Sequence, residues 1–187
     1  MNKPSTTEHE ILNTAKKYII KNGFSSCNIR AITKECGISV GTLYNYFPSK
    51  NALLGETVAS IWEEIFQPLS DSSKFEHFID IVSCMYEAIR NGNSEYPGFF
   101  SLHSLSFASD GKKEGLEMMN TCLSDLKKNL LSVLKQDVKV NQQRFCSDFT
   151  EEVFIDYIFT LMVSSLLKKE QPDPLYQFIV SFLYSSH

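Results

Sequence analysis

Residues 30–50, RAITKECGISVGTLYNYFPSK, are the segment that most constrains the fold of this 187-residue chain. Gly37 stands between two short stretches of helical character, where the chain must reverse, and glycine takes a left-handed backbone without steric cost. Ile32 lies on the apolar face of the first stretch, while Leu43 and Phe47, one turn apart, anchor the second. The pattern predicts a helix, a tight turn and a second short helix that ends at a proline.

The second helix of this pair has little apolar surface of its own. Asn28 and Ser39 are the expected N-caps of the two helices, because a side-chain oxygen can accept from the free backbone N–H groups of a first turn. The side of the second helix that does not face the domain carries a mixed polar and aromatic surface, which is suited to contact with a DNA groove. Its residues are Val40, Gly41, Thr42, Tyr44, Asn45 and Tyr46.

Charge is unevenly distributed along the chain. The whole chain has a formal net charge of −4, but residues 1–50 carry seven Lys/Arg against three Asp/Glu, and residues 51–187 carry eleven against nineteen. A basic first part and an acidic remainder would orient the molecule on a polyanion. The alternative is that Lys16, Lys17 and Lys21 are only the solvated face of an amphipathic helix.

The string GISVGTLYNYFPSKNALL, residues 37–54, resembles the helix-turn-helix of the TetR (tetracycline-repressor) family of transcription regulators. The glycine turn, the G-T-L-Y segment, the aromatic pair ending in Phe and the P-S-K sequence all agree, and the resemblance extends over about residues 7–55. It implies a regulator, expected to be a repressor, that binds a near-palindromic double-stranded operator as a homodimer and responds to a small-molecule effector.

The resemblance also implies roles for individual residues. Positions that match the family's base-reading positions are Arg30, Val40, Gly41, Thr42, Tyr44 and Asn45. Those that match its backbone-holding positions are Asn28, Thr42, Tyr46 and Lys50, and Ser39 completes the predicted contact surface. Arg30 could bind guanine and Asn45 adenine, whereas hydroxyl and ammonium groups suit phosphate. The alternative for Tyr44 is that it packs beneath the helix and makes no contact with DNA. Because Val40 and Gly41 offer no hydrogen-bonding side chain, direct readout of the bases would rest on few contacts.

Beyond residue 50 the sequence shows helical periodicity and no strand signals. We expect an all-α fold with two domains: a three-helix helix-turn-helix DNA-binding domain at residues 1–50, and a larger helical domain for effector binding and dimerisation at 51–187. Further helices are expected outside the helix-turn-helix, one of them ended by Asn91-Gly92, together with a polar loop at 137–148. The expected helices cover residues 7–22, 50–68, 75–89, 112–135, 150–167 and 175–184.

The last two predicted helices are apolar on more than one side. A terminal helix of a small domain cannot bury two faces within its own chain, so the second faces are expected to meet a copy of themselves in a four-helix bundle. The small side chain of Ser165 would let helices approach closely. The candidate dimer-interface residues are Phe154, Ile158, Leu161, Ser165, Tyr176, Val180 and Tyr184.

An effector pocket would need aromatic and methionine side chains with a few polar groups. Candidates on the predicted body helices and in the aromatic segment 97–108 are Trp62, Phe66, Tyr86, Phe99, Phe100, His103, Phe107, Met119, Cys122 and Met162. Most of these would equally suit an ordinary core. The effector expected of such a pocket is a flat or hydrophobic small molecule.

Two other interpretations remain open at this point. A thiol-based redox regulator on the same fold would use Cys27 or Cys36. An enzyme or small-molecule carrier would keep the helix-turn-helix domain at residues 1–50, the head, for another purpose. Catalytic motifs such as G-x-S-x-G, a phosphate loop or HExxH are absent from the sequence, so we do not expect an enzyme or a cofactor. Five cysteines without C-x-x-C spacing predict neither a disulfide framework nor a metal site. Without a long apolar run or a signal-like N-terminus, we expect a cytoplasmic protein and no membrane partner.

Overall fold

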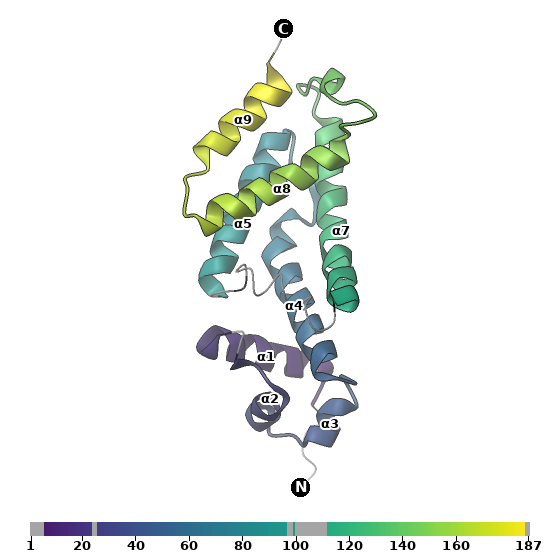
Figure 1. Cartoon of the computed structure of the whole chain (residues 1–187), viewed down its shortest axis with the longest axis vertical. Helices are drawn as coiled ribbons and strands as arrows, with labels where there is room; N and C mark the ends of the chain where they lie inside the picture. Colours follow the sequence, from purple (N-terminus) through teal and green to yellow (C-terminus); the bar gives the residue numbers. More distant parts are fainter. Residues whose placement is uncertain (1–5, 24–25, 97–98, 100–111, 186–187) are drawn as a thin grey trace. The chain divides into compact units, whose positions relative to one another are not determined.

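The computed structural model describes residues 6–23, 26–96, 99 and 112–185, with the backbone alone for 112–120 and 122. Within these ranges every extended regular element is a helix (Figure 1), which confirms the predicted all-α class. The helices are α1 (Glu8–Asn22), α2 (Ile29–Cys36), α3 (Val40–Tyr44), α4 (Lys50–Phe66), η2 (Gln67–Leu69), η3 (Ser72–Lys74), α5 (Phe78–Glu95), α7 (Lys112–Gln136), η5 (Gln142–Arg144), α8 (Glu151–Leu167) and α9 (Asp173–Tyr184). No helix of the described ranges has the length and apolar character that a membrane span requires.

The chain forms two compact units. The first consists of Met1–Glu64 and Asn93–Asn120, and the second of Ile65–Gly92 and Thr121–His187. The predicted helix-turn-helix therefore lies in the first unit. The two C-terminal helices, which carry the candidate dimer residues, lie in the second.

The second unit is built around apolar faces of four helices. In Figure 1, α8 and α9 run antiparallel as a helical hairpin, and the rings of Phe154 and Phe182 stack with centroids 5.2 Å apart. Each helix buries residues three or four positions apart, the spacing that places side chains on one face. These buried residues include Phe78, Ile81, Val82, Met85 and Ile89 on α5, Leu126, Leu130, Val133 and Leu134 on α7, Phe154, Ile155, Ile158 and Met162 on α8, and Leu175, Ile179 and Leu183 on α9.

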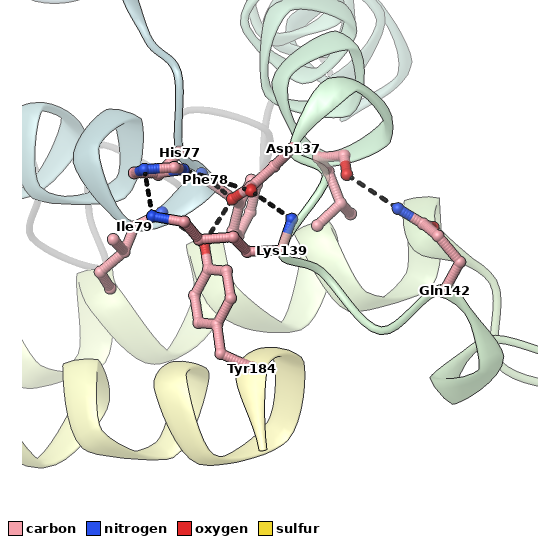
Figure 2. A network of polar contacts seen from close by, with 8 residues as sticks. His77, Phe78, Ile79, Asp137, Lys139, Gln142 and Tyr184 are labelled. Carbon is pink, nitrogen blue, oxygen red and sulfur yellow. Dashed lines mark hydrogen bonds and ion pairs between the residues drawn. The ribbon is translucent and has the colours of Figure 1, made fainter. Parts of the chain in front are cut away.

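A buried carboxylate joins three of these helices (Figure 2). Asp137 directly follows α7 and its side chain is fully buried. Its Oδ2 accepts from the Phe78 backbone N–H at 2.9 Å and from the Tyr184 hydroxyl at 2.7 Å. Its Oδ1 accepts from the Lys139 N–H at 3.0 Å and lies 3.3 Å from Nδ1 of His77. Burial alone would raise the pKa of Asp137, but these hydrogen bonds outweigh it and lower the pKa below its usual value.

One predicted helix end was wrong. Asn91-Gly92 does not stop its helix, because α5 continues to Glu95. A Cβ placed on Gly92 would lie 2.6 Å from Cδ1 and Cγ1 of Ile65 on α4. The glycine therefore allows close packing of α4 against α5 and does not cap the helix. The predicted loop at 137–148 contains the short helix η5 and approaches Phe149 through an isolated bridge from Cys146.

Candidate nucleic-acid interface

Side-chain caps and a left-handed glycine shape the helix-turn-helix as the sequence predicts. Oδ1 of Asn28 accepts from the Ala31 N–H at 3.0 Å at the start of α2, and Oγ of Ser39 accepts from the Thr42 N–H at 3.0 Å at the start of α3. Gly37 between the helices has φ 66°, a left-handed conformation that side chains with a Cβ rarely adopt. The predicted caps and turn are confirmed.

The short helix α3 is held by two buried anchors. Leu43 on α3 and Phe47 just beyond it are completely buried, together with Ile11 and Ile19 of α1 and Ile32 of α2. Five residues of helix cannot be stable in isolation, so the position of α3 depends on this shared core. The three helices of the head are therefore expected to move as one body.

Most of the predicted DNA-contact residues are exposed. Thr42 is half-buried, while the other candidates are open to solvent and surround the anchored side of α3. The exposed members are Asn28, Arg30, Ser39, Val40, Gly41, Tyr44, Asn45, Tyr46 and Lys50. A Cβ on Gly41 would meet only Oγ of Ser39, at 3.8 Å. The fold would accept a side chain at position 41, so the exposed backbone there results only from the choice of glycine.

Several of the candidate polar groups already have partners within the head, and the hydroxyl oxygens of Ser39 and Thr42 lie 2.8 Å apart in a hydrogen bond. The Tyr46 hydroxyl donates to the carbonyl oxygen of Thr6, directly before α1. The Asn28 amide nitrogen donates to the carbonyl of Ser26 at 2.9 Å. A phosphate oxygen can only accept, so a contact from Tyr46 to phosphate would require the hydroxyl to leave Thr6. Tyr46 is better placed to hold the start of α1 against the end of α3.

The cations at this surface are available for an anion. Among the residues that the structure describes, no carboxylate forms an ion pair with Arg30, Lys34 or Lys50, and all three are exposed. Lys50 is the first residue of α4, whose N-terminal amides favour negative charge. Lys16, in contrast, is paired with Glu64 at 2.9 Å.

The effector candidates that can be placed are divided between the two units. In the first unit, Trp62 and Phe99 are buried with ring centroids 5.0 Å apart. In the second, Phe66 lies 6.4 Å from Phe159 between centroids. Tyr86 there packs on Tyr176 and donates to the Glu170 carbonyl, and Met162 is fully buried. Phe100, His103 and Phe107, and the side chains of Met119 and Cys122, lie outside the described residues.

Only part of the candidate dimer face points outward. Phe154 and Ile158 are buried in the core of their own chain, and the Tyr184 hydroxyl is bonded to Asp137. Leu161 and Val180 are exposed, while Ser165 and Tyr176 are half-buried.

The sequence interpretation missed two exposed aromatic residues, Tyr157 on α8 and Phe178 on α9, with 58% and 49% of their surface exposed. Tyr157 lies four residues before Leu161, so helical spacing alone could have identified it.

The cysteines of the head are poorly suited to redox chemistry. Burial raises the pKa of the Cys27 thiol to about 11, despite the nearby Lys50 ammonium, which acts in the opposite direction. Burial also raises the pKa of Cys36, against a hydrogen bond with Thr14. A sensor thiol must be ionised to react with an oxidant, so these shifts disfavour a thiol-based regulator.

Comparisons with known proteins find the same motif at this surface. The sequence model of the family described as "Bacterial regulatory proteins, tetR family" matches residues 11–57. The transcriptional regulator UidR of Escherichia coli K12 is 38% identical over 87 residues, which is 44% of each chain, so the chain spans less than half the length of that relative. The regulator BetI of Vibrio campbellii is 28% identical over 145 residues, 72% of this chain and 71% of BetI.

A likeness in fold extends further than the likeness in sequence. A TetR family transcription regulator from Marinobacter aquaeolei VT8 superposes with a TM-score of 0.62 over 94% of both chains, at 18% identity. At that identity the superposition shows the fold alone.

Proposed function

We propose that this chain is a transcription regulator of the TetR family of bacterial regulatory proteins, whose sequence model matches residues 11–57, and that it binds a near-palindromic operator as a homodimer. The observation that carries the proposal is the exposed surface of α3 with Arg30 and Lys50 beside it. Most of its polar and aromatic side chains face solvent on a helix that is anchored by the buried Leu43 and Phe47. Because operator DNA lies in the cytoplasm, we place the protein there.

The reading surface combines two kinds of contact. Arg30, Thr42 and Asn45 can hydrogen-bond base edges in the major groove, and Tyr44 can pack on a thymine methyl or a sugar. Lys50 binds a phosphate at the start of α4, which fixes the register of the head on the backbone. We assign Tyr46 a different part from the one expected from the resemblance, that of holding the start of α1 through Thr6.

The dimer interface that we propose is the outward face of the α8–α9 hairpin. It includes Tyr157 and Leu161, one turn apart on α8, with Phe178 and Val180, which flank the buried stripe of α9 on opposite sides; each of the four is more than two-fifths exposed. Large apolar side chains exposed on neighbouring helices are typical of a surface that another protein covers. A two-fold pair would present two reading helices about one DNA turn, ~34–36 Å, apart or slightly more.

A small hydrophobic or aromatic effector is proposed to release the protein from its operator. Support comes from the buried aromatic and methionine side chains among the candidates, Trp62 and Phe99 in one unit and Phe66, Tyr86 and Met162 in the other. The effector acts only if it binds the two DNA-affinity states unequally. Repression is the expected sign, because a dimer across a promoter obstructs polymerase.

The test of the regulator is a titration of a labelled duplex from upstream of its own gene, with a scrambled duplex of the same composition as the control. We expect preference for the native duplex that persists as salt rises, with saturation at two chains per site or a multiple of two. Equal affinity for both duplexes that falls equally as salt rises would mean that the basic head binds DNA non-specifically. That result would reject recognition of an operator sequence.

The test of the interface is sedimentation of two matched variants, Val180→Glu and Val138→Glu. Both place a carboxylate at an exposed valine of the second unit, but Val180 belongs to the proposed interface, whereas Val138 is 92% exposed and lies outside it. We expect Val180→Glu to shift the protein toward monomer and Val138→Glu to sediment as the wild type. Dimers of unchanged stability in Val180→Glu would place the interface elsewhere.

A further inference from the structure

A chain of polar contacts in the first unit connects helix α1 of the head to a buried aromatic cluster. Nζ of Lys16 lies 2.9 Å from Oε2 of Glu64, and that carboxylate also accepts a hydrogen bond from the Tyr96 hydroxyl. Tyr96 follows the end of α5 and is almost completely buried. We call this chain of contacts, Lys16–Glu64–Tyr96, the polar relay.

The aromatic end of the polar relay contains the single tryptophan of the protein. The ring of Tyr96 lies 6.2 Å from that of Phe99, and Phe99 lies 5.0 Å from Trp62, measured between ring centroids. All three side chains are at most 5% exposed. A shift of Tyr96 must therefore change the surroundings of Trp62, because closely packed rings cannot move independently.

The other end of the polar relay is an unusual lysine. The Lys16 side chain is only 14% exposed, and a lysine is almost never buried unless it is paired. Its neighbour Lys17 is exposed, and no ion pair of Lys17 is found among the described residues. Glu64 is thus the partner that allows the ammonium of Lys16 to remain in place, and loss of that contact would release the lysine into solvent.

Helix α1 reports the position of the reading helix. Ile11 and Ile19 of α1 are buried together with Ile32 of α2 and Leu43 of α3, and α2 packs against both α1 and α3. A displacement of α3 on DNA is therefore transmitted to α1 and changes the geometry of the Lys16–Glu64 ion pair.

From these contacts we propose that the polar relay couples the position of the DNA-reading head to the packing of Tyr96, Phe99 and Trp62. The inference rests on the proposed function, because it takes DNA as the ligand of the head. Coupling free energy is reciprocal, so DNA bound at α3 alters the aromatic cluster as much as a change in the cluster alters DNA affinity. Two of the cluster residues, Trp62 and Phe99, are effector candidates. The polar relay would therefore help to release the protein from its operator when an effector binds.

The experiment follows Trp62 fluorescence in the whole chain, while the anisotropy of a labelled duplex from upstream of its own gene reports binding. The test variant is Lys16→Met, which keeps the apolar stem but removes the ammonium. Its matched control is Lys17→Met, which removes the same charge from the same helix without touching Glu64. Tyr96→Phe probes the other end, since it keeps the ring and removes the hydroxyl.

Two results are expected. Without DNA, Lys16→Met shifts the emission of Trp62 relative to the wild type, and Lys17→Met does not. With DNA at saturation, Trp62 emission changes in the wild type and in Lys17→Met, and that change is lost in Lys16→Met and Tyr96→Phe.

The inference is overturned if Trp62 emission is indifferent to DNA that anisotropy shows to be bound, or if Lys16→Met and Lys17→Met behave alike. A duplex that does not bind at all would refute the proposed function, and the comparison without DNA would then decide the polar relay separately. Glu64→Gln, which keeps the hydrogen-bonding shape without the charge, must behave as Lys16→Met does if the ion pair carries the coupling.

Discussion

Asp137→Ala is expected to destabilise the second unit far more than an ordinary surface substitution. The change removes the acceptor of the Phe78 N–H and the Tyr184 hydroxyl, which both point at the buried Oδ2. Each buried donor left without a partner costs about 1–3 kcal/mol. The Lys139 amide and the His77 ring lie nearer to solvent and can be hydrated, so they add little. The expected loss is about 4 kcal/mol, or roughly 8–16 °C in melting temperature for a chain of this size.

The assay is thermal unfolding by circular dichroism at equal protein concentration, with Asp148→Ala as the control at an exposed aspartate. The control should remain within about 0.5 kcal/mol of the wild type. Because the folded state lowers the pKa of Asp137, its stabilisation is complete above the ordinary aspartate pKa of about 3.9 and is lost as pH falls through the lower folded value. The gap between wild type and Asp137→Ala should therefore be constant from pH 7 to about 4 and narrow below that. Equal melting of the two variants, or a gap that narrows between pH 7 and 5, would refute the reasoning.

Three further predictions concern the head and the packing of α4. Lys50→Ala should weaken binding to every duplex alike and reduce the slope of log affinity against log salt by about one, and an unchanged slope would remove Lys50 from the phosphate contacts. Gly92→Ala should cost about 1–3 kcal/mol in denaturant unfolding because its Cβ meets Ile65 at 2.6 Å, and Ile65→Val in the same chain should recover part of that loss. With its pKa at about 11, Cys27 is about one part in a thousand thiolate at pH 8, so mass spectrometry should find it alkylated far more slowly than exposed Cys146, and equal rates would contradict its burial.

Local signals in the sequence were sufficient for the head. The caps at Asn28 and Ser39, the left-handed turn at Gly37 and the anchors Leu43 and Phe47 depend on residues within a few positions of one another, and the structure confirms each of them. The exposure of the α3 candidates follows from the same spacing. Short-range chemistry fixes these features because capping and helical periodicity act within one or two turns.

Contacts between residues far apart in the chain could not be predicted from the sequence. Nothing near Asp137 indicates that its carboxylate accepts from Phe78, 59 residues earlier, or from Tyr184, 47 residues later. Lys16 had the same sequence signature as Lys17, yet it alone pairs with Glu64.

The Asn91-Gly92 pair is typical of a helix end, but α5 continues past it. The glycine stands there because Ile65 approaches so closely that a side chain would not fit. The second apolar stripe of α8 was found by periodicity, but which stripe faces the core depends on the helices packed against it. That is why Phe154 and Ile158 lie inside and Tyr157 lies outside.

The measurement that tests the central claim most directly is a hydroxyl-radical footprint of the protein on the DNA upstream of its own gene. Two chains that insert α3 into successive major grooves should protect two patches related by a two-fold axis, with centres about one helical turn, ~34–36 Å, apart or slightly more. Replacement of Asn45 by Ala should weaken both patches together, because each chain contributes the same helix. A single asymmetric patch, or uniform protection without a preferred position, would contradict a dimeric operator-reading regulator.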